Sequence, residues 1–251
     1  MPVNPDTTFP LSVAAAVFLS GLAGLFLRGW RHTKGVDETR DLINRVTGVI
    51  ATLSSLVLGL LIVSANNFYN TQKAGLETAS ARVLQIDGLL RRFGPEAQQA
   101  RNVLKDMFAS KQINSGTLKM PTIEETNSSM DSLFAILNHL RQTAPDERKY
   151  LIAKAEDLAS SINEQRLQMS LQLSNSLTWP FMAILVSWAC LLFFGLAMLA
   201  SVSRTTVAVM GAGALSLASA IFLIVELSNP YSGLFRLSPD PALKTIEALS
   251  K

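Results

Sequence analysis

The chain has 251 residues, of which 49% are hydrophobic and 16% charged, with a net charge of +3 and a pI near 9.1. The basic residues neither cluster with aromatic residues nor form a continuous run, so the basic excess is interpreted as membrane topology and no nucleic-acid partner is expected. Cys190 is the only cysteine, which excludes an intrachain disulfide.

Four long stretches carry no charged side chain: residues 7–27, 46–72, 205–225 and a stretch within 167–203. Because a charge in the middle of a bilayer is costly, uncharged apolar runs of about 20 residues predict spanning helices. We therefore expect an all-α, polytopic membrane protein with four transmembrane helices and an extramembrane antiparallel helical bundle. The first expected part is a transmembrane hairpin at 7–66, with spans at about 9–29 and 46–66, and the second is a four-helix domain at 67–177. A second hairpin follows at 178–227, with spans at about 179–201 and 205–226, and the chain then forms a C-terminal elbow with a short helix at 228–251.

The first span is predicted to run from outside to inside. Residues 28–45 hold five Lys or Arg, whereas the residues before the span hold none. By the positive-inside rule this loop is cytoplasmic, which predicts a multi-pass protein of the bacterial inner membrane with both termini and the helical domain in the periplasm. Within this span Ala16, Ser20 and Gly24 are spaced four residues apart and predict a small-residue packing seam.

The second span carries a stripe of polar and small residues. Thr52, Ser55, Gly59 and Asn66 fall within an arc of about 60° on a helix, and Leu56 and Val63 lie beside them. One interpretation is a pore wall with an apolar neck formed by Leu56 and Val63. The other is close helix packing, which also favours small and hydroxylated residues.

The middle domain is expected to be helical almost throughout. Gly94 and Pro95 end its first helix, residues 113–121 form a loop, and Thr122 with Glu125 predicts a capping box. Pro145 ends the third helix. Because neither Pro nor Gly lies between residues 65 and 73, or between 151 and 178, the first and last bundle helices should continue directly into the second and third spans.

The end of the fourth span combines a carboxylate with turn residues. Glu226 is either a functional charge at a pore mouth or a hydrated residue in the headgroup region. The elbow that follows contains Asn229, Pro230, Tyr231, Gly233 and Asp240, and is interpreted as structural, with a cation site as the alternative. The chain contains two histidines and one cysteine, and its sequence has neither a phosphate loop nor a cluster with the spacing of metal ligands. We therefore expect no enzymatic activity, metal or cofactor.

Three segments resemble the bacterial bestrophin-like four-transmembrane family: LGLLIVSANNFYNTQ at 58–72, LETASARVLQIDGLLRRFGPEA at 76–97 and ELSNPYSGLFRLSPDP at 226–241. The resemblance implies kinship with bestrophins, which are homo-oligomeric anion channels, and suggests a pentamer. Bestrophins have a similar Asn-Pro-aromatic-Gly motif, which here carries an extra serine. The acidic run of the bestrophin calcium clasp and the aromatic neck are missing from this chain.

The leading hypothesis is therefore an oligomeric ion channel whose second span lines the path, with an anion as the implied ion. The expected partners are the lipid bilayer, further copies of the chain and ions. The alternative hypothesis is a membrane-anchored helical binding or sensor module that acts through a partner protein.

Overall fold

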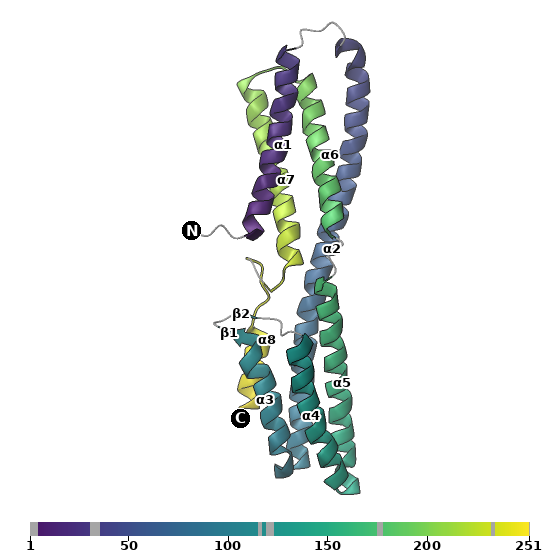
Figure 1. Ribbon diagram of the computed structural model, residues 1–251, viewed down its shortest axis with the longest axis vertical. Helices are drawn as coiled ribbons and strands as arrows, with labels where there is room; N and C mark the ends of the chain where they lie inside the picture. The colour runs from purple at the N-terminus through teal and green to yellow at the C-terminus, as the bar shows by residue number, and fades with distance from the viewer. Residues whose placement is uncertain are drawn as a thin grey trace. The chain divides into compact units, whose positions relative to one another are not determined.

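The computed structural model describes residues 5–30, 36–114, 117–118, 123–174, 178–231 and 234–250, and these residues are almost entirely helical (Figure 1). The helices are α1 (Pro5–Trp30), α2 (Val36–Phe93), a 3-10 turn (Pro95–Ala97), α3 (Gln98–Gln112), α4 (Ile123–Thr143), α5 (Asp146–Ser174), α6 (Thr178–Leu199), α7 (Arg204–Ser228) and α8 (Asp240–Leu249). The all-α prediction is confirmed. The expected loop at 113–121 differs in one detail, because β1 (Ile113–Asn114) and β2 (Thr117–Leu118) pair antiparallel within it, Ile113 opposite Leu118.

The chain divides into two compact units. A four-span unit comprises residues 1–68 and 176–229, and a bundle unit comprises residues 69–175 and 230–251. Among the described residues, four helices are long and apolar enough to cross a membrane, at Thr8–Arg28, Arg40–Phe93, Pro180–Leu199 and Arg204–Ser228. The prediction of four spans is confirmed.

Helix α2 belongs to both units, and its 58 residues form one unbroken helix. The predicted continuity of the second span with the first bundle helix is therefore confirmed. The corresponding junction between α5 and α6 involves residues 175–177, which lie outside the described residues. Helix α2 ends where predicted, because Gly94 has a φ of +123°, a backbone conformation that residues with a Cβ rarely adopt. Pro95 then starts the 3-10 turn.

In the four-span unit, α1 packs against α6 and α7. The core of this unit is apolar and draws on all four helices, with Val13, Val17, Leu61, Ala65, Met182, Leu185, Ala189, Ala214, Ile221 and Ile224 buried. The predicted seam on α1 is only partly correct. Ser20 donates a 2.7 Å hydrogen bond to the carbonyl of Cys190, and Gly24 lies directly against α6, but Ala16 is exposed. Bulkier residues, Val13 and Val17, occupy the packed face in its place.

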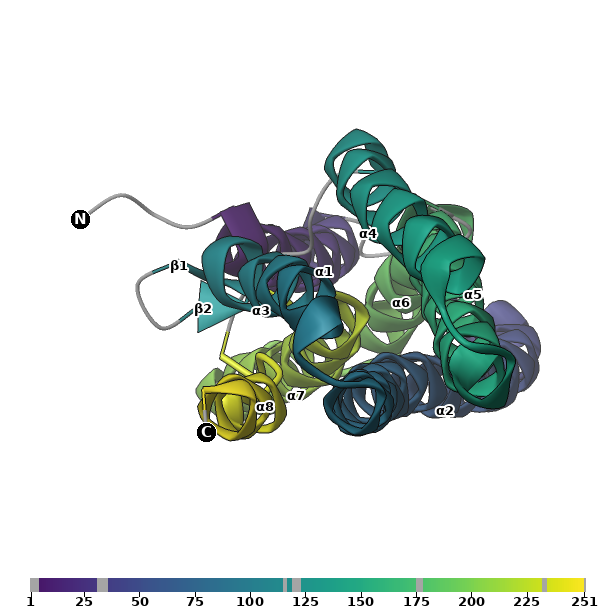
Figure 2. The same ribbon diagram turned by 90° about the horizontal axis from the view of Figure 1, so that it is seen from below.

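In the bundle unit, α4 packs against α5, and α3 packs against both α4 and α8 (Figure 2). Apolar side chains from α2, α3, α4, α5 and α8 share one core, in which Ile86, Leu90, Leu133, Leu137 and Ile152 are fully buried. One charge is buried beside them, since Asp87 is only 4% exposed. Its two carboxylate oxygens accept from Arg91 at 2.7 Å and Arg101 at 2.6 Å, so the buried charge is paired. The predicted capping box involves Thr122, which lies outside the described residues.

The close approach of α1 and α6 at Gly24 makes a testable prediction. A Cβ at this position would lie 2.6 Å from the carbonyl oxygen of Phe194 and 2.8 Å from the Cβ of Ala197, neither of which is a flexible side-chain end. We expect Gly24→Leu to destabilise the protein by about 1–3 kcal/mol or more, because the helices must separate. Thermal unfolding in detergent measures this loss. Ala16→Leu, at an exposed position of the same helix, is the control and should leave the unfolding temperature close to that of the wild type.

Candidate functional site

The six candidate pore-lining residues of α2 lie together on one exposed surface. This surface, called here the α2 face, consists of Thr52, Ser55, Leu56, Gly59, Val63 and Asn66, all of which are exposed. Leu56 is 70% exposed and Val63 is 56% exposed, although both are large and apolar. A Cβ added at Gly59 would meet no atom within 4 Å. Close packing within this chain therefore does not explain why the face is small and polar.

The buried side of α2 is opposite to this face. Leu61 and Ala65 are 8% and 5% exposed and belong to the core of the four-span unit. At 100° per residue, Leu61 points about 180° away from Thr52. One side of α2 therefore packs against the neighbouring helices, and the α2 face on the other side is exposed.

The polar groups of the α2 face are neutral. The hydroxyl of Thr52 donates to the carbonyl of Gly48 at 3.0 Å, and that of Ser55 donates to the carbonyl of Ala51 at 2.9 Å. Each hydroxyl oxygen still has lone pairs that can accept from water, and the Asn66 amide can both donate and accept. Because residues 46–72 contain no charged side chain, any interaction of this face with ions must use dipoles and water.

Glu226, the predicted charge at a pore mouth, is not on an exposed surface. It lies near the end of α7 and is 3% exposed. The interpretation of Glu226 as a hydrated headgroup residue is therefore wrong. Its burial was not predictable from its position two residues before the helix end, because burial depends on packing with distant parts of the chain.

The elbow after α7 begins where the turn residues predict. Helix α7 ends at Ser228, the Asn229 side chain donates to the Val225 carbonyl at 3.1 Å, and the Leu237 amide donates to the Pro230 carbonyl at 2.8 Å. Asp240 is exposed in the first turn of α8, and Gly233 lies outside the described residues. Within the described ranges, no group of three His, Cys, Asp or Glu residues could hold a metal ion.

Tyr231 of this elbow takes part in a buried polar network that the sequence did not reveal. Its hydroxyl donates to Oε1 of Gln72 at 3.0 Å, and Nε2 of Gln72 donates to Oε1 of Gln172 at 3.2 Å. Gln72 is fully buried. One signal was present, since Gln72 precedes the buried Leu76 and Ala79 by four and seven residues and so belongs to the same helical stripe. Burial raises the pKa of Tyr231 to about 12.

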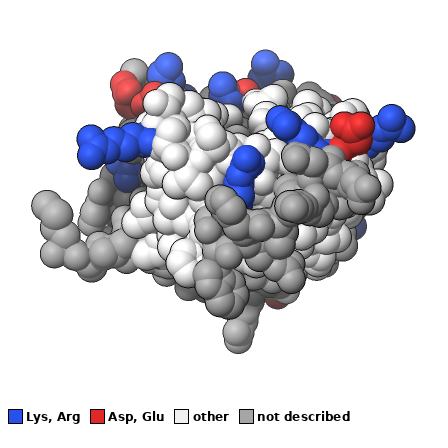
Figure 3. All heavy atoms as spheres, turned by 90° about the horizontal axis from the view of Figure 1, so that it is seen from above, with Lys and Arg blue, Asp and Glu red and all other residues white. Residues whose placement is uncertain are grey.

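Basic side chains, with acidic ones beside some of them, are visible in the view onto the end of the four-span unit where α1 and α6 end and α2 and α7 begin (Figure 3). Arg40, Arg45 and Arg204 are exposed there, and Arg28 donates to the carbonyl of Met198 at 3.0 Å. This is the end that the positive-inside rule places in the cytoplasm, and the orientation remains a prediction.

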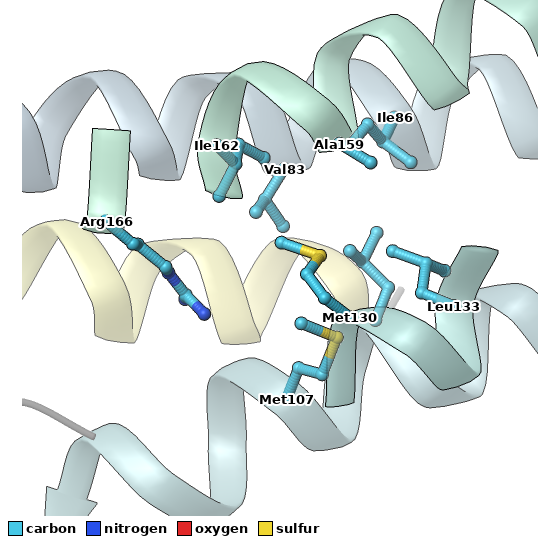
Figure 4. A pocket seen from close by; sticks show the side chains of 9 residues that line it. Val83, Ile86, Met107, Met130, Leu133, Ala159, Ile162 and Arg166 are labelled. Carbon is cyan, nitrogen blue, oxygen red and sulfur yellow. The ribbon is translucent and has the colours of Figure 1, made fainter. Parts of the chain in front are cut away.

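The described part of the bundle core contains a small cavity, which is bordered by Val83, Ile86, Met107, Met130 and Arg166 among others (Figure 4). Its volume is about 10 Å³. That is about the space of a single water molecule. Arg166 lies at its edge, and burial lowers the pKa of this guanidinium.

Comparison with known proteins identifies a family model and several solved structures that are similar to this chain. Residues 13–242 match the family model of the Bestrophin-like domain. A crystal structure of a bacterial bestrophin homologue from Klebsiella pneumoniae with a tryptophan-to-alanine mutation is similar, with a TM-score of 0.61 and 13% identity, covering 98% of this chain and 97% of that chain. A tyrosine-to-alanine variant of that homologue has a TM-score of 0.59 and 13% identity, covering 95% of this chain and 97% of the other.

A further crystal structure, of a membrane protein, has a TM-score of 0.55 and 15% identity and covers 96% of each chain. At these identities the structural likeness shows the fold. No protein with curated annotation matches the chain.

The buried network predicts the effect of removing one hydroxyl. Tyr231→Phe leaves Oε1 of the fully buried Gln72 without its phenol donor, so we expect a loss of about 1–3 kcal/mol of unfolding free energy. Chemical unfolding in detergent measures the difference. Tyr150→Phe, at a residue that is 66% exposed, is the matched control and should change stability by less than about 0.5 kcal/mol. Equal effects of the two substitutions would contradict the role of the network.

The raised pKa of Tyr231 predicts a late phenolate titration. The difference in phenolate absorbance between the wild type and Tyr231→Phe should have its midpoint at pH about 12. The folded protein holds this proton more tightly than the unfolded chain, in which a tyrosine titrates near pH ~10. The contribution of Tyr231 to stability is therefore complete below pH ~10 and is lost as the pH rises toward the folded value. A midpoint near ~10 would show that the phenol is exposed to water.

Proposed function

The chain belongs to the bestrophin-like family of membrane proteins, and from this membership we propose that several copies assemble into an ion channel with the α2 face around its axis. The family is one of multi-pass membrane proteins and not of enzymes. Relationship to bestrophin homologues supports an anion as the conducted ion and a pentamer as the assembly. The proposed orientation places both termini and the bundle unit in the periplasm.

The exposure of the α2 face is the observation that carries this proposal. Of the four candidate spans, α2 is the least enclosed, with 11% of its apolar window buried compared with 22–33% in the others. A lone protomer in a bilayer would turn Thr52, Ser55 and Asn66 toward lipid, which offers their free hydrogen-bonding capacity no partner. Other copies of the chain, with water between them, satisfy these groups.

The order of side chains along the face suggests their roles. Leu56 and Val63 are seven residues apart, which places them about 10 Å apart along the axis and on the same side of the helix. Together they would form an apolar neck that controls the passage of water and ions. Thr52 and Ser55 would line the path before the neck, and Asn66 after it. Because Glu226 is buried, it would act on ions through its electric field and not by direct contact.

The alternative of a ligand-sensing bundle has less support. A sensor for a small molecule needs a binding pocket of roughly 300–1,000 Å³. The cavity in the described part of the bundle core has a volume of about 10 Å³, which is far below this size.

The proposed neck predicts the effect of shortening its side chains. Val63→Ala and Leu56→Ala should each raise the rate of ion flux from phospholipid vesicles severalfold, because the constriction becomes wider and less apolar. Chloride and potassium gradients, applied separately, identify the conducted ion.

The control is Leu60→Ala, which makes the same chemical change at a residue that is also 70% exposed. Leu60 lies about 80° around the helix from Thr52, outside the arc of the α2 face, so its truncation should leave the flux unchanged. Absence of flux in both salts, or equal responses of all three variants, would refute the channel proposal.

A further inference from the structure

A second feature of the four-span unit is an apolar groove between α6 and α7. Its volume is about 480 Å³. It is called here the α6–α7 groove, and the side chains that define it are Phe193, Leu196, Val209 and Met210, with Thr205 and Thr206 at one end. The polar end lies where α7 begins, beside Arg204. The groove is thus amphiphilic, with a long apolar part and a short polar part.

The dimensions of the groove correspond to one leaflet of a bilayer. It extends along α7 from Thr205 to Gly213, a depth of about 12 Å at the helical rise per residue. Half of the hydrocarbon core of a bilayer is about 15 Å thick. A lipid acyl chain that enters the groove at the membrane surface can therefore remain in it across most of one leaflet.

Charge at the polar end selects the kind of lipid. Residues 167–225 contain a single charged residue, Arg204, which is exposed. Arg28 is nearby on the same side of the unit, since it donates to the Met198 carbonyl near the end of α6. The positive end of the α7 dipole adds to this field. Among the exposed charged residues that the structure describes at this end, Arg40, Arg45 and Arg204 outnumber Asp41, so an anionic headgroup is complementary to it.

From these observations we propose that the α6–α7 groove is a binding site for an anionic phospholipid. One acyl chain fills the apolar part, and the phosphate contacts Arg204 at the polar end. This site is separate from the α2 face and does not depend on ion conduction.

Native mass spectrometry of the detergent-purified full chain tests the site. The probes are palmitoyl-oleoyl phosphatidylglycerol and phosphatidylcholine, which have the same acyl chains and differ in net charge. We expect the wild type to retain phosphatidylglycerol in preference to phosphatidylcholine. Arg204→Gln should lower phosphatidylglycerol retention about tenfold, as expected for the loss of one charge-assisted contact, and should leave phosphatidylcholine retention unchanged. Arg204→Lys should keep most of the preference.

Two matched controls separate this site from general attraction to lipid. Val209→Trp fills the groove at a position that is 66% exposed and should reduce retention of both lipids, whereas Leu215→Trp, 64% exposed on the same helix but outside the groove, should not. Arg45→Gln removes another exposed cation at the same end of the unit and should have little effect. Unchanged retention in Arg204→Gln and Val209→Trp would overturn the proposal. A change of oligomeric state in Val209→Trp without a change in lipid retention would also overturn the proposal, because that result assigns the groove to side chains of a second copy.

Discussion

The backbone hydrogen bonds of α2 run without interruption from Val36 to Phe93, and the α2 face depends on this continuity. Hydrocarbon cannot satisfy free amide and carbonyl groups, so a chain that crosses a bilayer must keep its helical bonds throughout the span. In α2 the same helix then continues for about seven turns beyond Asn66 into the bundle unit. The α2 face and the buried Gln72 thus belong to one continuous helix.

Polar groups inside each unit are paired in different ways. In the described part of the bundle unit, the buried carboxylate of Asp87 is paired with two arginines, and Gln72 accepts from the Tyr231 phenol and donates to the Gln172 amide. In the four-span unit, the Ser20 hydroxyl of α1 donates to the Cys190 carbonyl of α6. A short side chain that bonds to the backbone of a neighbouring helix allows the two helices to approach closely, which is a form of packing that a bilayer favours.

Much of the fold was predictable because its determinants are local. Uncharged runs marked the four spans, and Gly94-Pro95, Pro145 and Asn229-Pro230 marked helix ends, since these residues act on their own backbone. The position of the six α2-face residues on one side of the helix was also predictable, because it follows from helix geometry alone, whereas the exposure of that side was left open by the sequence. The burial of Glu226, the exposure of Ala16 and the partner of Tyr231 were not predictable. Each depends on which distant segment packs against the residue, and helical spacing alone carries no information about that choice.

The bond between Tyr231 and Gln72 joins residues that are 159 positions apart. At a synthesis rate of about 5–20 residues per second, the ribosome adds Tyr231 roughly 8–32 s after Gln72. Throughout this interval the amide must remain hydrated or find a temporary partner while the intervening spans enter the bilayer. The phenol therefore joins the interior after the four candidate spans have been synthesised, and a nascent chain stalled before it would contain these four spans while its amide still awaited that donor.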